Sequence, residues 1–75
     1  MVFVNKVILE NLKEYYPVGT RVKLVSMDDP QAPAKGSFGT VIYVDSTGTI
    51  HVSWDCGSSL GVIYGEDKIE KVEKT

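Results

Sequence analysis

Residues 39–64, GTVIYVDSTGTIHVSWDCGSSLGVIY, decide the fold, because they read as two β-hairpins in series. The apolar run 41–44 is followed by the turn residues 45–48, DSTG, whose glycine is free to adopt positive φ. Apolar and polar residues then alternate over 50–54, and a second turn at 55–58, DCGS, leads into a third apolar run. Short strands with turn signals at this spacing predict a small antiparallel β-barrel.

The run 41–44 also predicts a local irregularity. Val41 and Val44 lie three positions apart, so a flat strand would turn their side chains to opposite faces. A bend or bulge between them would bring both inward, and small barrels need such bends. We therefore expect a bulge in this strand.

Two further strands are expected, an alternating one at 20–25 and a short closing one at 69–72. A barrel of this size needs large side chains to fill it, which favours an inward tryptophan. The predicted core consists of Val22, Leu24, Val41, Ile50, Val52, Trp54, Leu60 and Val62.

The N-terminal part predicts a helix over residues 5–16, NKVILENLKEYY, because apolar residues from Val4 onward recur at helical spacing. Asn5 is a suitable N-cap, and Pro17 ends the segment because the residue before a proline disfavours helical angles. A strand over residues 2–9 is the rival interpretation, since Val, Phe and Ile are enriched there.

Composition places the chain among small single domains of 75 residues. Eight Lys and Arg face ten Asp and Glu, a net charge of -2, whereas dedicated nucleic-acid binders usually have a basic excess. The lone cysteine excludes an internal disulfide and suits a reducing compartment. Neither a signal peptide nor a membrane span is recognisable, so we expect a cytoplasmic protein without a membrane partner.

The residues offer little for catalysis or metal binding. His51 is the only histidine and Cys56 the only thiol, on a predicted strand face and a turn tip respectively. One His and one Cys do not make a closed zinc site, and the acidic pairs 28–29 and 66–67 lack the spacing of a calcium loop. We therefore expect no enzyme activity, no metal and no cofactor.

A binding surface is expected where the longest irregular stretch, 26–37, leads into the barrel, because a loop this long inside a compact domain is often functional. If that loop lies beside the turn at 45–48, a partner would meet an apolar floor and an acidic wall. The predicted contact residues are Phe38, Tyr43, Asp28, Asp29 and Asp45. Alternatively, the two aromatics plug the barrel and the loop is idle.

Nucleic acid is the second candidate partner. Arg21, Lys23 and Lys35 would form a small basic strip on one side of the barrel. Adjacent acidic residues at 28–29 and the net negative charge disfavour this alternative.

Seven segments carry a resemblance to a known family: Tyr16-Pro17, Gly19-Thr20-Arg21-Val22, Met27-Asp28-Asp29-Pro30, Gly39-Thr40-Val41, Gly48-Thr49-Ile50-His51-Val52, Trp54-Asp55 and Gly57-Ser58-Ser59-Leu60-Gly61. They resemble a small bacterial family of unknown function whose members occur largely in phages, plasmids and integrated elements. Residues 48–60 also resemble the SH3-like barrels appended to some eukaryotic ubiquitin ligases. The chain departs from the family pattern at Cys56, where asparagine is expected, and at Lys68, where a large residue is expected.

The resemblance implies an SH3-like barrel but no activity and no site residues. The predicted fold is all-β, a small five-stranded SH3-like barrel (18–75) with a short N-terminal α-helix (1–17). The predicted function is a non-catalytic binding module for a protein partner in a phage or mobile-element context, with nucleic-acid binding as the alternative.

Overall fold

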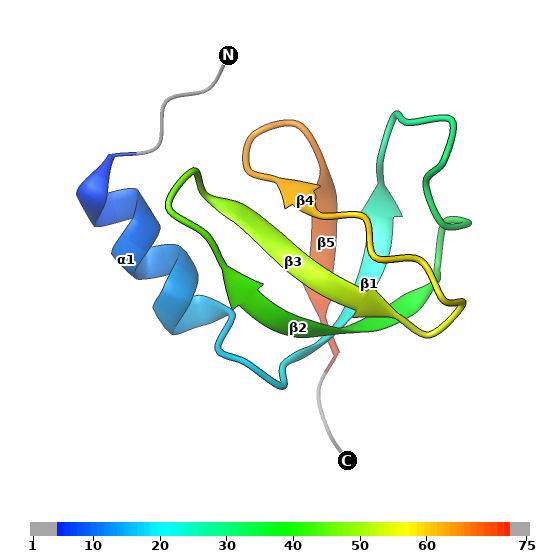
Figure 1. Cartoon of the computed structure of the whole chain (residues 1–75), viewed down its shortest axis with the longest axis horizontal. Helices are drawn as coiled ribbons and strands as arrows, with labels where there is room; N and C mark the ends of the chain where they lie inside the picture. Colours follow the sequence, from blue (N-terminus) through cyan, green and yellow to red (C-terminus); the bar gives the residue numbers. More distant parts are fainter. Residues whose placement is uncertain (1–4, 73–75) are drawn as a thin grey trace.

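The computed structural model describes residues 5–72, which form one helix and five strands (Figure 1). Their bounds are α1 Lys6–Tyr15, β1 Arg21–Ser26, β2 Phe38–Val44, β3 Thr49–Trp54, β4 Val62–Ile63 and β5 Lys68–Lys71. The predicted strands are all present, and the helix is confirmed over the rival strand. Val4, expected on the apolar side of the helix, lies outside the described residues.

The strands form a single antiparallel sheet in the order β4-β3-β2-β1-β5. The first strand therefore lies between the second and the last, and β4 and β5 are the two edges. These edges do not pair with each other, so the sheet is open. Figure 1 shows that it is strongly curved. The fold is thus a mostly β domain with one five-stranded sheet and one short helix.

The expected bulge is present in β2. Val41 pairs with Val52 and Tyr43 pairs with His51, so Ile42 is an extra residue in the ladder. The extra residue restores the inward direction for Val44, which packs against the core although it lies three positions after Val41. Ile42 and Tyr43 are consequently both exposed.

The core lies on the concave side of the sheet. Seven of the eight predicted core residues are buried there, and Leu12 of α1 joins them. The prediction is wrong for Leu60, which is half-buried in the connection between β3 and β4. Its contribution comes from its carbonyl, which accepts a hydrogen bond of 2.9 Å from Trp54 Nε1 and so satisfies the only polar atom of that buried ring.

Local sequence sets both ends of α1. The Asn5 side chain accepts a hydrogen bond of 2.9 Å from the Ile8 amide, which satisfies a free donor of the first turn. Pro17 follows the C-cap Tyr16, and the turn after it is held by Thr20, whose hydroxyl donates to the Pro17 carbonyl. No helix among the described residues is long and apolar enough to cross a membrane.

Candidate functional site

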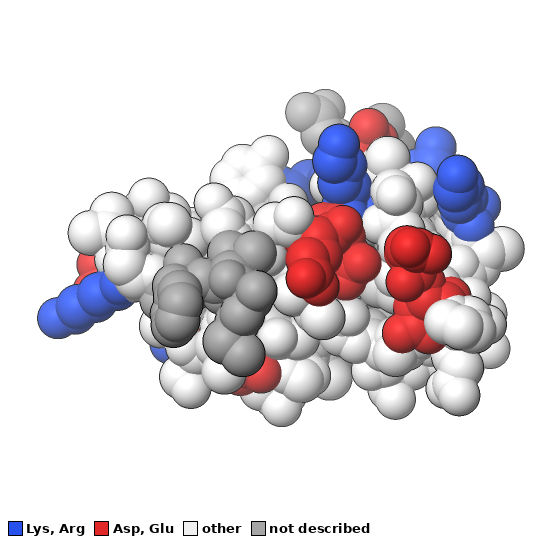
Figure 2. All heavy atoms as spheres, turned by 90° about the horizontal axis from the view of Figure 1, so that it is seen from above, with Lys and Arg blue, Asp and Glu red and all other residues white. Residues whose placement is uncertain are grey.

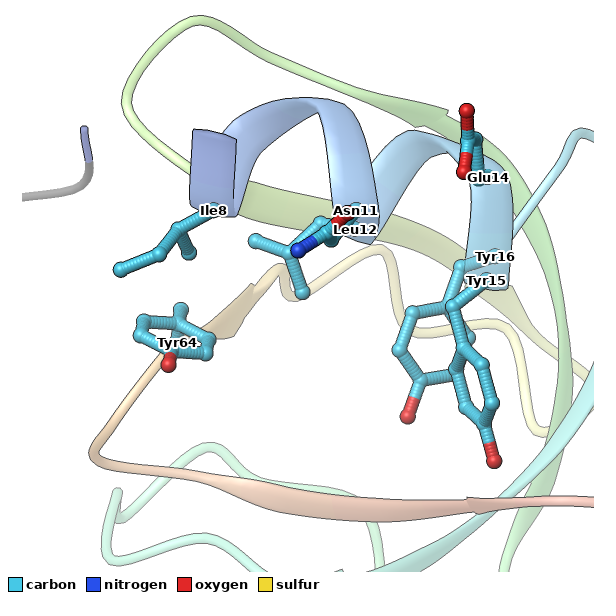
Figure 3. Close-up of a pocket in the computed structure, with 7 residues that line it drawn as sticks. All are labelled: Ile8, Asn11, Leu12, Glu14, Tyr15, Tyr16 and Tyr64. Atoms are coloured by element: carbon cyan, nitrogen blue, oxygen red, sulfur yellow. The ribbon is translucent and has the colours of Figure 1, made fainter. Parts of the chain in front are cut away.

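A hollow of about 600 Å³ in the described surface lies between α1 and the β4–β5 side of the sheet. We call it the tyrosine groove. Figure 3 shows the side chains that line it: Ile8, Asn11, Leu12, Glu14, Tyr15, Tyr16 and Tyr64. Three of these seven residues are tyrosines, and they come from two segments far apart in the sequence.

The end of α1 places the first two tyrosines. Tyr15 is the last helical residue and Tyr16 is the C-cap, whose amide still donates to the Leu12 carbonyl at 2.8 Å. Their rings meet edge to face, with centroids 4.8 Å apart. Figure 3 shows both rings directed away from the helix, across the groove. An edge-to-face pair is a rigid apolar surface that retains hydroxyl groups for hydrogen bonding.

The two tyrosines differ in their surroundings. Tyr16 is half-buried and packs against the core, whereas 57% of Tyr15 is exposed. Burial, and secondarily the neighbouring Tyr15, raises the pKa of the Tyr16 hydroxyl above its ordinary value. The Tyr16 hydroxyl therefore keeps its proton to higher pH than that of a free tyrosine.

The third tyrosine, Tyr64, is placed by the tight connection between β4 and β5. The amides of Glu66 and Asp67 both donate to the Ile63 carbonyl, and the Ile63 amide donates to Asp67 Oδ2 at 2.9 Å. This closed turn presents Tyr64 on its outer side, opposite Ile8 and Leu12 (Figure 3). The turn thus holds one wall of the groove while α1 forms the other.

The groove continues along β5. A second hollow of about 490 Å³ shares Leu12, Tyr16 and Tyr64 with it and reaches the buried Ile50 and Val62. A third, of about 540 Å³, is bounded by the tyrosine pair of α1 on one side and residues 69–72 on the other. Shared residues therefore join the three hollows into one trough between α1 and β5, which is apolar beside β4 and more polar along β5.

Acidic residues border this trough at one end. Glu66 and Asp67 line the second hollow, and Ser26 pairs with Lys68, so the β1–β2 connection with Asp28 and Asp29 begins beside them. Figure 2 shows acidic clusters side by side on the face formed by these two connections. We call these four carboxylates the acidic rim.

The structure separates the residues predicted as a single contact surface. Phe38 begins β2 and Tyr43 lies near its end, so most of the strand separates them, and both are exposed on its outer side. The β1–β2 connection and the β2–β3 turn consequently lie at opposite ends of the sheet (Figure 1). The expectation that these two loops lie side by side is wrong, because consecutive hairpin connections leave a strand at opposite ends.

Asp45 is engaged inside the β2–β3 turn. Its Oδ1 accepts from the amides of Thr47 and Thr49 and from the Thr47 hydroxyl, and its Oδ2 lies 2.8 Å from His51 Nε2. These donors, led by the Thr47 hydroxyl and the His51 ring, hold the pKa of the Asp45 carboxyl well below its usual range. The His51 ring in turn stacks on Tyr43, with centroids 4.2 Å apart. Asp45 therefore organises the hairpin and faces its own turn.

The predicted basic strip is only partly available for binding, because its arginine is already paired. Arg21 forms a bidentate ion pair with Asp55, at 2.9 and 2.7 Å, and a further hydrogen bond to Thr40. This pairing raises the pKa of the arginine and lowers that of Asp55. Lys23 lies on the same strand face and Lys35 in the β1–β2 connection, both exposed.

No group of three or more His, Cys, Asp or Glu side chains among residues 5–72 is arranged to bind a metal ion. Over the same range, Asp45 is the side chain that hydrogen-bonds to His51, and Cys56 is exposed at its turn.

The tyrosine groove was not predicted from the sequence. Tyr15 and Tyr16 were expected only as the end of an apolar helix face, and nothing in the periodicity pairs them with Tyr64. The available signal for the groove in the sequence was the three tyrosines themselves, because tyrosine is suited to surfaces that are both apolar and hydrated.

Comparison with known proteins gives one match. Neither the search of curated proteins nor that of solved structures found a similar protein. A family model described as a domain of unknown function, DUF4314, matches residues 5–72, which include α1 and all five strands. The chain therefore belongs to the DUF4314 family.

Proposed function

We propose that this domain is a non-catalytic, cytoplasmic protein-binding module whose contact surface is the tyrosine groove. The observation that carries the proposal is the convergence of Tyr15, Tyr16 and Tyr64 on one apolar hollow. Exposure of 57% for Tyr15 and 36% for Tyr64 is more than a core role requires. Tyrosines with exposed rings beside a groove are typical of protein-binding surfaces.

We also infer that the open sheet is an SH3-like barrel. The strand order, with β1 between β2 and β5, and the bulge that bends β2 support this assignment. The resemblance of the sequence to a family from phages and mobile elements adds that setting to the proposal.

The acidic rim gives the module its charge preference. Asp28 and Asp29, predicted as contact residues, remain in the proposal because their connection begins opposite Lys68, which follows Glu66 and Asp67 in the chain. Four carboxylates at the end of an apolar trough favour a partner with basic residues and accelerate its approach. Phe38 and Tyr43 lie on the outer side of β2, so they provide control positions for the groove.

Nucleic-acid binding has less support. Arg21, the central residue of the predicted basic strip, is already paired with Asp55. Phosphate binding through this side would require breaking a bidentate ion pair. We expect no binding to DNA or RNA tighter than non-specific levels at physiological salt, and no steep dependence of affinity on salt.

Site-specific photocrosslinking in the source cell tests the proposed function. A benzophenone amino acid at Tyr64 should give an adduct with a protein, and the same group at Phe38 should not. Both positions are exposed, so the comparison is matched. Adducts from Phe38 alone, adducts with nucleic acid, or no adduct from Tyr64 would contradict the proposal.

A further inference from the structure

The outer edge of β5 carries main-chain groups that have no hydrogen-bond partner within residues 5–72. Leu24, which lies opposite Ile69, directs its amide to the Ser37 carbonyl and its carbonyl to the Gly36 amide, away from β5. Leu24 and Ile69 therefore form a non-hydrogen-bonded pair, in which the groups of Ile69 also point away from β1.

The next residues follow the same alternation. The Val72 amide donates to the Arg21 carbonyl at 2.9 Å, so Val72 faces β1 and Lys71 does not. Within residues 5–72, the amides and carbonyls of Ile69 and Lys71 consequently face the trough, whereas those of Glu70 face β1. Two donors and two acceptors thus stand in a row along this edge.

The opposite edge of the sheet is closed by contrast. The strand β4 has only two residues, and both main-chain groups of Ile63 are bonded within the following turn. Edge strands that are short and self-satisfied resist pairing with another chain. Only the β5 edge is therefore built to accept a further strand.

We propose, resting on the function proposed above, that β5 binds an extended segment of the partner protein as an additional strand. Such a strand lies about 4.8 Å from β5 and points alternate side chains to opposite faces. One set of its side chains would enter the trough between Tyr16 and Ile69, and the other set would lie beside Glu70.

Charge around the trough selects the sequence of that segment. The acidic side chains of Glu14, Glu66, Asp67 and Glu70 line the trough with Lys68 and Lys71. Lys23 lies opposite Glu70 on β1, so the acidic excess is small and is concentrated at Glu66 and Asp67. The ammonium group of Lys71 lies over the Tyr15 ring, 4.4 Å from its centroid, in a cation–π contact that holds it on the α1 side of the trough. The fitting segment alternates apolar and basic residues.

The rival occupant is β5 of a second copy. An antiparallel pair centred on Ile69 would place Lys68 opposite Glu70 of the other chain, which is favourable. A second copy would nevertheless bring its whole sheet to this edge, and α1 already lies beside it through the contact of Tyr15 with Lys71. We therefore expect a monomer in sedimentation velocity, and a dimer lost on Lys68→Glu substitution would overturn the peptide assignment.

A synthetic peptide of sequence KVKVKVK is the first probe. Titrated to millimolar concentration, it should shift the amide resonances of Ile69 and Lys71 in NMR spectra, and its glutamate analogue EVEVEVE should bind more weakly. Two N-methylated forms, at the three valines or at three lysines, provide matched controls. In an added strand, only every second peptide amide faces β5. One methylated form should therefore lose about tenfold or more in affinity for the domain, and the other should bind as the unmodified peptide does. Absence of shifts at Ile69 and Lys71, or equal binding by the two methylated forms, would overturn strand addition.

Proline substitution in the protein is the second test. Lys71→Pro removes an amide that faces the trough and should abolish peptide binding while the domain remains folded. Glu70→Pro removes an amide that faces β1 and should destabilise the sheet. Unchanged binding by folded Lys71→Pro would contradict the proposal. If that result were found together with a Tyr64 adduct in cells, only strand addition would be contradicted and the protein-binding module would remain supported. If Tyr64 gave no adduct in cells, the proposed binding module itself would be contradicted.

Discussion

The β2–β3 hairpin and the α1–β5 trough are two regions of this small domain with opposite roles. In the hairpin, Trp54 and Val52 are buried and the Asp45 carboxylate accepts four hydrogen bonds within its own turn. In the trough, the tyrosine rings are partly exposed and the edge groups of β5 have no partner within residues 5–72. The Asp45 carboxylate of the hairpin is satisfied by hydrogen bonds within the domain, whereas the edge groups of β5 would be satisfied by a bound ligand.

This difference indicates that stability and recognition are divided between regions. Substitutions in the hairpin should act on folding, and substitutions in the trough should act on binding. Four substitutions test this division, from the largest effect on stability to the smallest.

Trp54→Ala should have the largest effect. Trp54 is 2% exposed and its indole donates to the Leu60 carbonyl, so truncation leaves a cavity and an unpaired acceptor. We expect a loss of about 3–5 kcal/mol in the free energy of unfolding, measured in urea. Ser53→Ala, on the exposed side of the same strand, is the control and should change stability little. A Trp54→Ala protein with wild-type stability would show that the hairpin is not the stabilising region.

Leu12→Ala tests whether α1 contributes to the stability of the domain or only to the binding surface. Leu12 is the one residue of α1 that is buried in the core, and it also forms the floor of the trough. Thermal and urea unfolding should show a loss of about 2–3 kcal/mol. Val7→Ala, at a position that is 65% exposed, should cost less than about 0.5 kcal/mol. Equal stability of the two variants would mean that α1 is an independent arm.

Asp45→Asn should have an intermediate, pH-dependent effect. The pKa of Asp45 is lower in the folded state than its unfolded value of about 3.9, so its stabilising contribution is present above that pH. The variant should be about 1 kcal/mol less stable at pH 7. The gap should narrow as the pH falls below about 4 toward the folded pKa, because the wild-type carboxyl takes up a proton in the unfolded chain before it does so in the folded one. A gap that is constant from pH 7 to acid would contradict the assigned role of the charge.

Tyr64→Ala should have the smallest effect on stability, less than about 0.5 kcal/mol, because the side chain lies on the outside of a turn held by main-chain bonds. The same variant should lose most binding of the KVKVKVK peptide. Ile42→Ala, on the outer side of β2, should leave binding unchanged. Loss of stability with intact binding would reverse the division between the two regions.

The same division explains what could be predicted from the sequence. Alternation fixed the inward residues of β1 and β3, and the three-residue spacing of Val41 and Val44 required the bulge that is present at Ile42. These features depend on neighbours along one strand or across one hairpin. Leu60 was misassigned because its position in an irregular connection, outside any alternating strand, decides its exposure.

The candidate site was beyond the reach of such patterns. The order of the strands determines that Tyr16 and Tyr64 line one groove and that Phe38 and Tyr43 do not share a loop cluster. Likewise, Arg21 meets Asp55 across the sheet, which no local pattern reveals. Long-range contacts of this kind require the curvature of the sheet and the angle of α1, and neither is encoded in periodicity.

The pairing of β5 with β1 has a consequence for synthesis on the ribosome. Of the five strands, β5 is translated last, yet its partner β1 is translated first. While the chain emerges, β1 and β2 can form their hairpin, but one edge of β1 has no strand beside it until residue 71 has left the exit tunnel. During that interval the nascent domain exposes a strand edge that resembles the one β5 offers later. Completion of the sheet therefore transfers the open edge from the beginning of the chain to its end.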